Sequence, residues 1–177
     1  MSKLKIGDKA IPFALPGVDG RERALADYID QEVVVVFFSC NHCPYVRAWE
    51  DRIVQLQADY AAKGVQLIAI SSNDAEKYPD DSFSKMKERA QEKGFNFPYL
   101  YDETQEVARY YDAERTPEFF VFDRARILRY HGAMDDNYED PTAVTQQYLR
   151  DALNAVLAGK DPEVPQTPPV GCTIKWK

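Results

Sequence analysis

The sequence predicts an α/β domain in which a central mixed β-sheet is flanked by helices. Residues 33–38 (VVVVFF) and 65–70 (VQLIAI) are continuous apolar runs, typical of strands buried on both faces. A stretch of helical periodicity separates them, and a right-handed strand–helix–strand crossover makes such strands parallel. Residues 119–122 and 127–131 predict two further strands joined by a short turn, which indicates an antiparallel hairpin.

A second hairpin is expected ahead of this sheet, in the chain up to about Asp27. The turn Gly17-Val18-Asp19-Gly20 separates residues 13–15 from residues 23–25. This hairpin is an N-terminal extension of the α/β domain.

The periodic stretch after Pro44 predicts the first helix. Its apolar residues recur every three or four positions until Gly64 ends the pattern: Trp49, Ile53, Leu56 and Tyr60. The second long strand is followed by a polar loop at residues 71–74 and a polar helix from about Asp81 to Lys93.

The second half of the chain predicts shorter elements. Residues 97–101 predict a strand or an extended segment, and Asp102 with Gln105 resembles a capping box that opens a brief helix through Tyr110. Residues 141–158 predict an amphipathic helix that Gly159 ends. We expect one domain over residues 1–160 and an extended, proline-rich C-terminal tail over residues 161–177.

Composition limits the classes of function. The chain has 177 residues, is 45% hydrophobic and carries a formal net charge of -7, so it can bury one core but has no basic stripe for nucleic acid. The amino terminus lacks the apolar segment of a signal peptide, and no run approaches membrane-spanning length. We therefore expect a cytoplasmic protein without nucleic-acid or membrane partners, in which a cysteine pair is transient and catalytic.

The most informative motif is Cys40-Asn41-His42-Cys43, which joins the end of the first long strand to the start of the first helix. Only a thiolate attacks a disulfide, and the N–H groups and positive dipole end of a helix start stabilise that anion. We expect Cys40 to be the outward-facing thiol of low pKa, with His42 favouring its anion further. Cys40 would then attack a substrate disulfide, and Cys43 would resolve the mixed disulfide.

Other readings of the cysteine pair remain open. A structural zinc site needs four ligands, and only Cys172 and His131 remain as candidates beyond the motif. Copper(I) suits two thiolates and an imidazole, so a non-enzymatic copper or redox-partner binding protein is an alternative. The enzymatic reading requires no cofactor and no metal.

Beyond the motif, the arrangement resembles the thioredoxin superfamily. This resemblance is carried by the C-x-x-C pair after a buried strand, the strand–helix–strand unit and Thr116-Pro117 before the second hairpin. The redoxin branch, which includes AhpC/TSA-like proteins, is resembled by the N-terminal hairpin, the Ser71-Ser72-Asn73-Asp74 loop with its following helix, and residues 116–123. The Gly171-to-Trp176 ending is similar to a subgroup of bacterial thioredoxin-like redoxins, so the resemblance covers nearly the whole chain. The resemblance implies a thioredoxin-like fold, in which Pro117 is a cis-proline facing the cysteines and the Thr116 backbone hydrogen-bonds a substrate peptide.

Two residues differ from thioredoxins proper. Val34 occupies the position of a buried Asp that could relay the Cys43 proton, and Ser39 replaces the Trp before the motif. These differences weaken the prediction of general protein-disulfide reduction but not that of thiol–disulfide oxidoreductase chemistry. We expect a thiol or disulfide protein or a small thiol as partner.

A peroxiredoxin-like thiol peroxidase is the main alternative. By the resemblance, Cys43 followed by Pro44 would be the peroxidatic cysteine and a hydroperoxide the substrate. The family's Pro-x-x-x-Thr/Ser-x-x-Cys motif would place Pro at Val36 and Thr at Cys40, and its activating Arg falls at Pro117 rather than Arg115.

Two further residues have weaker assignments. Cys172 is a candidate third redox thiol, although we favour a tail packed by Ile174 and Trp176 in which this thiol is incidental. His131 is expected to be an ordinary surface histidine. The sequence leaves the oligomeric state, the physiological substrate and the electron donor open.

Overall fold

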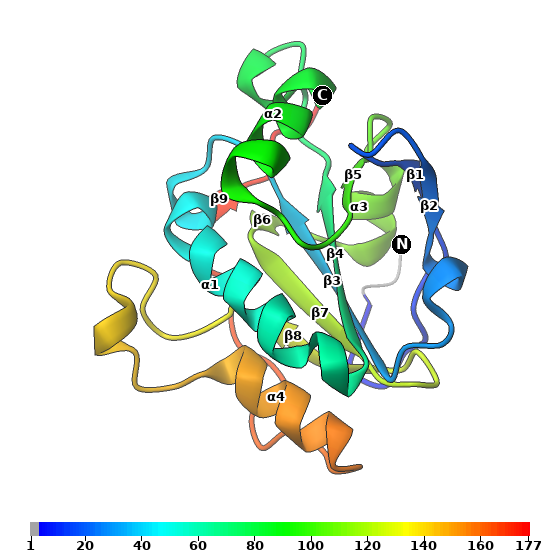
Figure 1. Ribbon diagram of the computed structural model, residues 1–177, viewed down its shortest axis with the longest axis vertical. Helices are drawn as coiled ribbons and strands as arrows, with labels where there is room; N and C mark the ends of the chain where they lie inside the picture. Colours follow the sequence, from blue (N-terminus) through cyan, green and yellow to red (C-terminus); the bar gives the residue numbers. More distant parts are fainter. Residues whose placement is uncertain (1–3) are drawn as a thin grey trace.

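A five-stranded mixed sheet forms the centre of the computed structural model, which describes residues 4–177 (Figure 1). The strand order is β5-β4-β3-β7-β8. The strands are β3 (Val33–Ser39), β4 (Val65–Ser71), β5 (Tyr99–Tyr101), β7 (Glu118–Phe122) and β8 (Leu128–Gly132). β4 runs parallel to β3 and β5, whereas β7 runs antiparallel to β3 and β8, so the predicted mixed sheet is confirmed. The first three residues of the predicted 1–160 domain lie outside the described residues.

The sheet is buried on both faces because residues 33–38 of its central strand, β3, are all apolar, so apolar side chains point to each face. Val33, Val35 and Phe37 pack into a core beneath α1 (Pro44–Tyr60) and α4 (Tyr148–Leu157). Their neighbours along β3 pack into a second core with α3 (Glu106–Tyr111) and the N-terminal segment. The absence of polar alternation in the sequence therefore predicted this strand correctly.

The N-terminal hairpin is also confirmed. β1 (Ala14–Pro16) pairs antiparallel with β2 (Glu22–Ala24), and a short 3-10 helix, η1 (Leu25–Tyr28), leads into the sheet. The hairpin lies beside β5, where Gly17 forms a bridge with Leu100.

The first two helices follow the prediction closely. α1 begins at Pro44 and continues into η2 (Ala61–Lys63), which ends at Gly64 with a φ of 83°. Such a left-handed conformation favours glycine. The polar helix α2 (Phe83–Lys93) is capped by the Ser82 hydroxyl and is preceded by η3 (Pro79–Asp81).

The predicted capping box ahead of α3 is wrong. Asp102 does accept hydrogen bonds from the amides of Val107 and Ala108. Gln105, however, adopts a left-handed conformation and donates to the Ser72 and Lys175 carbonyls instead of returning to the helix start. The amide of Gln105 is therefore used to connect α3 to the C-terminal tail.

The predicted helix over 141–158 is too long at its N-terminal end. Pro141–Ala143 forms a single 3-10 turn, η4, and the α-helix begins only at Tyr148. Asp136 accepts from the Thr145 amide at 2.9 Å, and Asp140 accepts from the Thr142 amide at 2.9 Å. These side-chain bonds hold the intervening backbone in turns that compete with helix formation. Gly159, with a φ of 73°, ends the helix as predicted.

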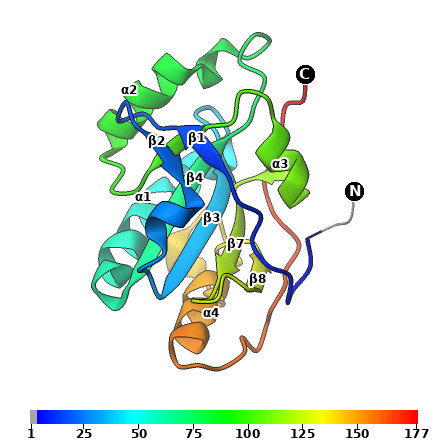
Figure 2. The ribbon, with the colours of Figure 1, turned by 90° about the vertical axis from the view of Figure 1, so that its right-hand side faces the viewer.

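The C-terminal tail runs from the end of α4 along the β8 side of the sheet to the C-terminus near α3 (Figure 2). It begins by forming a bridge between Gln166 and His131. It then forms β9 (Cys172–Thr173), which pairs antiparallel with β6 (Arg115–Thr116). The tail is extended as expected, but it follows a defined route.

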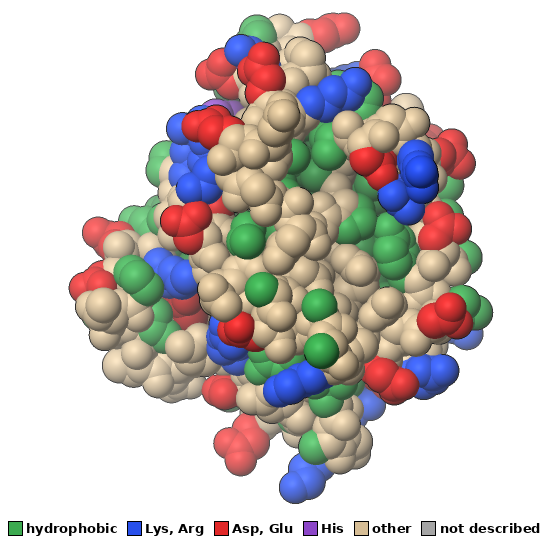
Figure 3. Space-filling model, viewed as in Figure 1, with side chains coloured by type: hydrophobic (Ala, Val, Ile, Leu, Met, Phe, Trp, Pro, Cys, Tyr) green, Lys and Arg blue, Asp and Glu red, His purple; other side chains and the backbone are tan. Residues whose placement is uncertain are grey.

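The surface carries acidic and basic side chains interspersed around the rim of the face in Figure 3. Among the helices of residues 4–177, none combines the length and the hydropathy that a membrane span requires.

Candidate active site

The C-x-x-C segment lies between the end of β3 and the start of α1. β3 ends at Ser39, and Cys43 has the extended conformation of a helix N-cap residue, with Pro44 in the first turn. Proline suits the first turn because an N–H at this position would have no acceptor within the helix, so its absence costs no hydrogen bond. The helix start is therefore next to Cys43, and Cys40 lies three residues before it.

Both cysteines of the motif are buried. Cys40 is 2% exposed and Cys43 is 0% exposed, and they pack with Val46 in a small cluster. The expectation that Cys40 faces outward is therefore wrong. The most exposed of the three cysteines is Cys172, whose side chain is half-buried at the edge of the same cluster.

Thr116 contacts both sulfurs. Its hydroxyl lies 3.7 Å from Cys40 Sγ, and its carbonyl accepts from the Cys43 thiol at 3.4 Å. The Thr116–Pro117 peptide bond is cis, as the family resemblance implied. Sequence and structure therefore bring Cys40, Cys43, Thr116 and Pro117 together at one end of the sheet.

The electrostatics of the pair differ from the prediction. A hydrogen bond from the Cys40 thiol is the largest cause that lowers the pKa of Cys43, and the Cys172 thiol and the Val46 amide lower it further. The same bond to Cys43, followed by burial and the charge of Asp81, raises the pKa of Cys40. The predicted low pKa of Cys40 is therefore wrong, because the helix begins at Pro44 and its N–H groups serve Cys43.

Asp81 is a buried carboxylate that the sequence reading missed. It is 0% exposed, and it accepts from the Asn41 amide and the Asn73 side chain, each at 2.8 Å. Its second oxygen also lies 2.5 Å from Nδ1 of His42. No local sequence pattern identifies Asp81 as a site residue, because it belongs to η3 and contacts Asn41 across a sequence separation of 40 residues.

Cys40, His42 and Asp81 place three ligand-type atoms within 4.8 Å of one another. Structural zinc sites use four such ligands. Both oxygens of Asp81 are already engaged by Asn41 and Asn73, so this cluster of described residues is explained as a hydrogen-bonded support for the motif.

Asn41 and His42 have different surroundings. Asn41 is buried, and its side chain accepts from the Tyr99 hydroxyl at 2.8 Å and donates to the Asp80 carbonyl at 2.9 Å. His42 is partly exposed and stacks on Tyr78 with ring centroids 5.9 Å apart. Asn41 thus attaches the motif to the sheet, and His42 lies at its solvent side.

Cys172 lies against this site. It is the register partner of Thr116 across the β6–β9 pair, and its side chain packs on the cluster of Cys40, Cys43 and Val46. The predicted packing of the tail by Ile174 is confirmed, since this side chain is 3% exposed, whereas Trp176 is exposed. That the Cys172 thiol is incidental is not tested by these contacts and stays a prediction.

His131 is not a surface residue. It is 7% exposed and lies 2.7 Å from the Glu118 carboxylate, which is itself 1% exposed. The other Glu118 oxygen accepts from the Glu114 and Arg115 amides, so this pair supports the loop that carries Thr116.

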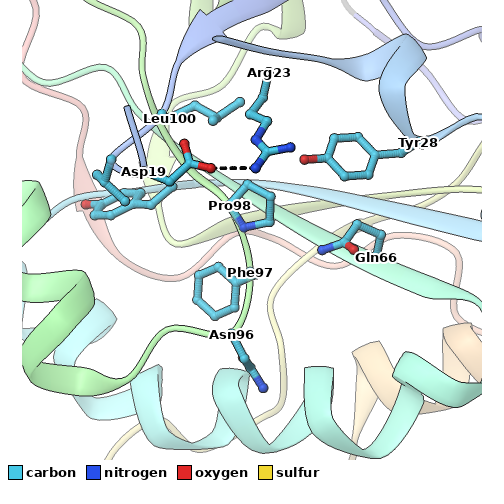
Figure 4. A pocket seen from close by; sticks show the side chains of 11 residues that line it. Asp19, Arg23, Tyr28, Gln66, Asn96, Phe97, Pro98 and Leu100 are labelled. Carbon is cyan, nitrogen blue, oxygen red and sulfur yellow. Dashed lines mark hydrogen bonds and ion pairs between the residues drawn. The ribbon is translucent and has the colours of Figure 1, made fainter. Parts of the chain in front are cut away.

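A separate pocket lies between the N-terminal hairpin and β5, and Figure 4 shows the Asp19–Arg23 ion pair at its edge. Its lining includes Gln66, Phe97 and Leu100 but none of the three cysteines. The pocket is therefore distinct from the cysteine site.

Comparison with known proteins agrees with the fold. An uncharacterised conserved protein from Geobacillus kaustophilus has 47% sequence identity to the chain and superposes with a TM-score of 0.93, covering 98% of this chain and 93% of that one. A hypothetical protein from Sinorhizobium meliloti 1021 has 38% identity and a TM-score of 0.93, covering 99% and 97%.

Two named relatives are more distant. A Mycobacterium tuberculosis protein that is provisionally named a peroxiredoxin is 26% identical over 147 residues, covering 83% of this chain and 87% of its own. The thiol-disulfide oxidoreductase ResA of Geobacillus thermodenitrificans is 27% identical over 125 residues, covering 67% and 64%. The AhpC/TSA family model matches residues 6–131, which include the sheet, the C-x-x-C segment and the cis-proline. With its thioredoxin-like fold, the chain therefore belongs to the AhpC/TSA family, in the redoxin branch of the thioredoxin superfamily.

Proposed function

We propose that the protein is a thiol–disulfide oxidoreductase that works through a reversible disulfide between Cys40 and Cys43. The observation that carries this proposal is that the two sulfurs share one buried cluster at the start of α1 and both contact Thr116. Two thiols in contact can exchange two electrons as a disulfide without a cofactor. The named relative ResA supports the same chemistry.

Cys43 is the better nucleophile in this arrangement. Its thiolate attacks one sulfur of a substrate disulfide and releases the other as a thiolate, which forms a mixed disulfide on Cys43. Cys40 then gives up its proton and attacks Cys43 Sγ, which closes the internal disulfide and releases the second substrate thiolate. The order predicted from the sequence, with Cys40 first, is the alternative.

The neighbouring residues have positioning roles in this proposal. Thr116 holds both sulfurs through its hydroxyl and carbonyl, and it precedes the cis peptide bond to Pro117. Asn41 and His42 tie the motif to Asp81. A thiol or disulfide protein or a small thiol is the partner, and a cytoplasmic location stays a prediction.

Peroxide reduction is the second candidate, favoured by the lowered pKa of Cys43 and by the provisional name of the mycobacterial relative. The Cys43 thiolate would attack a peroxide oxygen, giving a sulfenic acid and an alcohol, and Cys40 would then form the disulfide and release water. Arg115, the nearest arginine in sequence to the family position, is exposed and donates to the Gly171 carbonyl at 3.2 Å. This use of Arg115 disfavours rapid peroxide chemistry, which needs preorganised donors at the leaving oxygen.

Parallel assays of insulin disulfide reduction and hydroperoxide consumption test the proposal on the wild type and on Cys40→Ser and Cys43→Ser. We expect disulfide turnover in the wild type and none in Cys43→Ser. With Cys172 also replaced by Ser, so that it cannot resolve an adduct, a mixed disulfide should be trapped on Cys43 in Cys40→Ser/Cys172→Ser. A mixed disulfide trapped on Cys40 in Cys43→Ser/Cys172→Ser, with none on Cys43 in Cys40→Ser/Cys172→Ser, would restore the order predicted from the sequence. Peroxide turnover without disulfide turnover would instead favour the second candidate.

A further inference from the structure

The backbone edge that the family resemblance assigns to a substrate peptide is occupied by the protein's own tail. Thr116 and Cys172 are direct register partners in the antiparallel pair of β6 and β9. Figure 1 shows β9 beside β6 and near the first turn of α1. A cysteine from the same chain therefore stands where a substrate cysteine would be presented to the motif.

This docking depends on a glycine immediately before Cys172. A Cβ built on Gly171 would lie 2.0 Å from the Thr116 carbonyl oxygen, which is a backbone atom. A residue with a side chain could not approach Thr116 so closely. Gly171 thus allows the tail to lie directly on the loop that holds both sulfurs.

The tail is also fixed on the far side of Cys172. The Ile174 amide donates to the Glu114 carbonyl at 3.0 Å, and the Ile174 side chain is 3% exposed. Lys175 is held in both directions, since its amide donates to Asn73 at 2.9 Å and its carbonyl accepts from Asp74 at 2.8 Å. These bonds place Cys172 in one position against the motif.

The three sulfurs are arranged with Cys43 in the middle. Cys43 interacts with both Cys40 and Cys172, whereas Cys40 interacts with Cys43 and with the Thr116 hydroxyl. Cys172 is the most exposed of the three sulfur-bearing residues, because Cys40 and Cys43 are buried and Cys172 reaches partly into solvent. An external thiol can therefore approach Cys172 more readily than either motif cysteine.

We propose that Cys172 is a third redox-active residue, which moves the disulfide from the buried motif to the surface. The proposal rests on the Cys40–Cys43 disulfide of the proposed function. The Cys172 thiolate attacks Cys43 Sγ, the Cys40–Cys43 bond breaks, and Cys40 leaves as a thiolate that takes up a proton. The product is a Cys43–Cys172 disulfide, with no net change in oxidation state.

An external dithiol completes the cycle at the exposed sulfur. Its first thiolate attacks Cys172 Sγ and releases the Cys43 thiolate, a good leaving group because it is stabilised at the helix start. Its second thiolate then attacks the dithiol sulfur that is bonded to Cys172, which breaks that bond and releases the Cys172 thiolate. The dithiol leaves as a disulfide, and all three cysteines are reduced.

The linkage is tested by oxidising full-length Cys40→Ser with one equivalent of oxidised glutathione and mapping disulfides by mass spectrometry of a non-reducing digest. We expect an intramolecular Cys43–Cys172 disulfide, because the first mixed disulfide on either thiol is resolved by the other. A matched control, Cys40→Ser/Cys172→Ser/Thr173→Cys, moves the thiol by one residue, to the opposite side of the strand. This control should stop at a glutathione adduct.

A kinetic readout tests the relay in the otherwise intact protein. The rate at which dithiothreitol reduces the oxidised protein can be monitored by intrinsic fluorescence. It should be about tenfold slower in Cys172→Ser than in the wild type, because the dithiothreitol thiolate must then attack a buried sulfur. Equal rates, or a glutathione adduct without the Cys43–Cys172 linkage in Cys40→Ser, would overturn the relay. Failure of the wild type to form any Cys40–Cys43 disulfide would instead overturn the proposed function itself.

Discussion

The fully buried carboxylate of Asp81 lies 2.5 Å from Nδ1 of His42 inside the C-x-x-C motif. The family resemblance leads one to expect a buried acid at position 34, where this chain has valine. Asp81 supplies a buried negative charge from η3 instead, on the Cys40 side of the motif. The charge therefore acts on a different sulfur from the one that an acid on β3 would serve.

Removing this charge should make Cys40 more acidic. Asp81 raises the pKa of Cys40 through its charge, so Asp81→Asn should lower that pKa and increase the thiolate-to-thiol ratio of Cys40 by about tenfold at a given pH. The measurement is thiolate absorbance at 240 nm against pH in a Cys43→Ser/Cys172→Ser background, where Cys40 is the only thiol. Asp80→Asn removes an adjacent but exposed carboxylate and serves as the control. An equal shift in both variants would contradict a specific role for Asp81.

The acidity of Cys43 should depend on the hydrogen bond from Cys40. Because this bond is the largest cause that lowers the pKa of Cys43, Cys40→Ala should raise that pKa by about one to two units. Cys40→Ser retains an O–H donor and should raise it less. The same absorbance titration, with Cys172→Ser in every variant, gives both values.

The pH dependence of Cys43 reactivity follows from the sign of this shift. Because the Cys43 pKa is lowered to about 4, Cys43 stays ionised well below pH 7, so its reaction rate with a small disulfide should change little between about pH 7 and pH 5 when Cys40 is present. In Cys40→Ala the rate should fall with pH across the same window. Identical profiles for the alanine and serine variants would argue against the hydrogen bond as the cause.

The fold was largely predictable because its signals are local. The apolar runs of β3 and β4 and the turn at residues 17–20 each depend on neighbouring residues, and each is present as expected. The register of Thr116 with Cys172 depends instead on contacts more than fifty residues apart, which no local pattern encodes. Gly171 was the available signal, since a glycine beside a cysteine permits a close backbone approach.

His131 shows the same limit within a predicted hairpin. Composition alone favoured a surface histidine, yet β7 and β8 pair so that His131 lies opposite Phe120 and within reach of Glu118. An acid and a histidine on adjacent predicted strands were the signal for a buried pair. Asp81 offered no such signal, because it contacts Asn41 across a sequence separation of 40 residues.

The Glu118–His131 pair should contribute strongly to stability. Glu118→Ala leaves His131 and two backbone amides without their acceptor inside the protein, so it should cost about 3–5 kcal/mol of unfolding free energy. Glu118→Gln keeps an oxygen for the amides and an N–H for a neutral imidazole, so it should cost less. Urea unfolding of the reduced protein measures both.

An exposed acid provides the comparison for this pair. Glu163→Ala should change the unfolding free energy by less than about 0.5 kcal/mol. If Glu118→Ala changed the unfolding free energy as little as Glu163→Ala, the Glu118–His131 pair would not stabilise the loop before Pro117.

Gly171→Ala should separate the tail from the motif. The new Cβ would lie 2.0 Å from the Thr116 oxygen and 2.6 Å from its carbonyl carbon, and neither backbone atom can rotate away. The strand β9 must therefore shift, at a cost of about 1–3 kcal/mol that is typical of overpacking. Because β9 packs over the sulfurs, the shift should make Cys43 react faster with a maleimide while it reduces Cys43–Cys172 cross-linking in the Cys40→Ser background. Val170→Ala, at an exposed position of the same tail, should change neither quantity. Unchanged cross-linking in Gly171→Ala would mean that the approach of Cys172 to Cys43 does not require the close contact between Gly171 and Thr116.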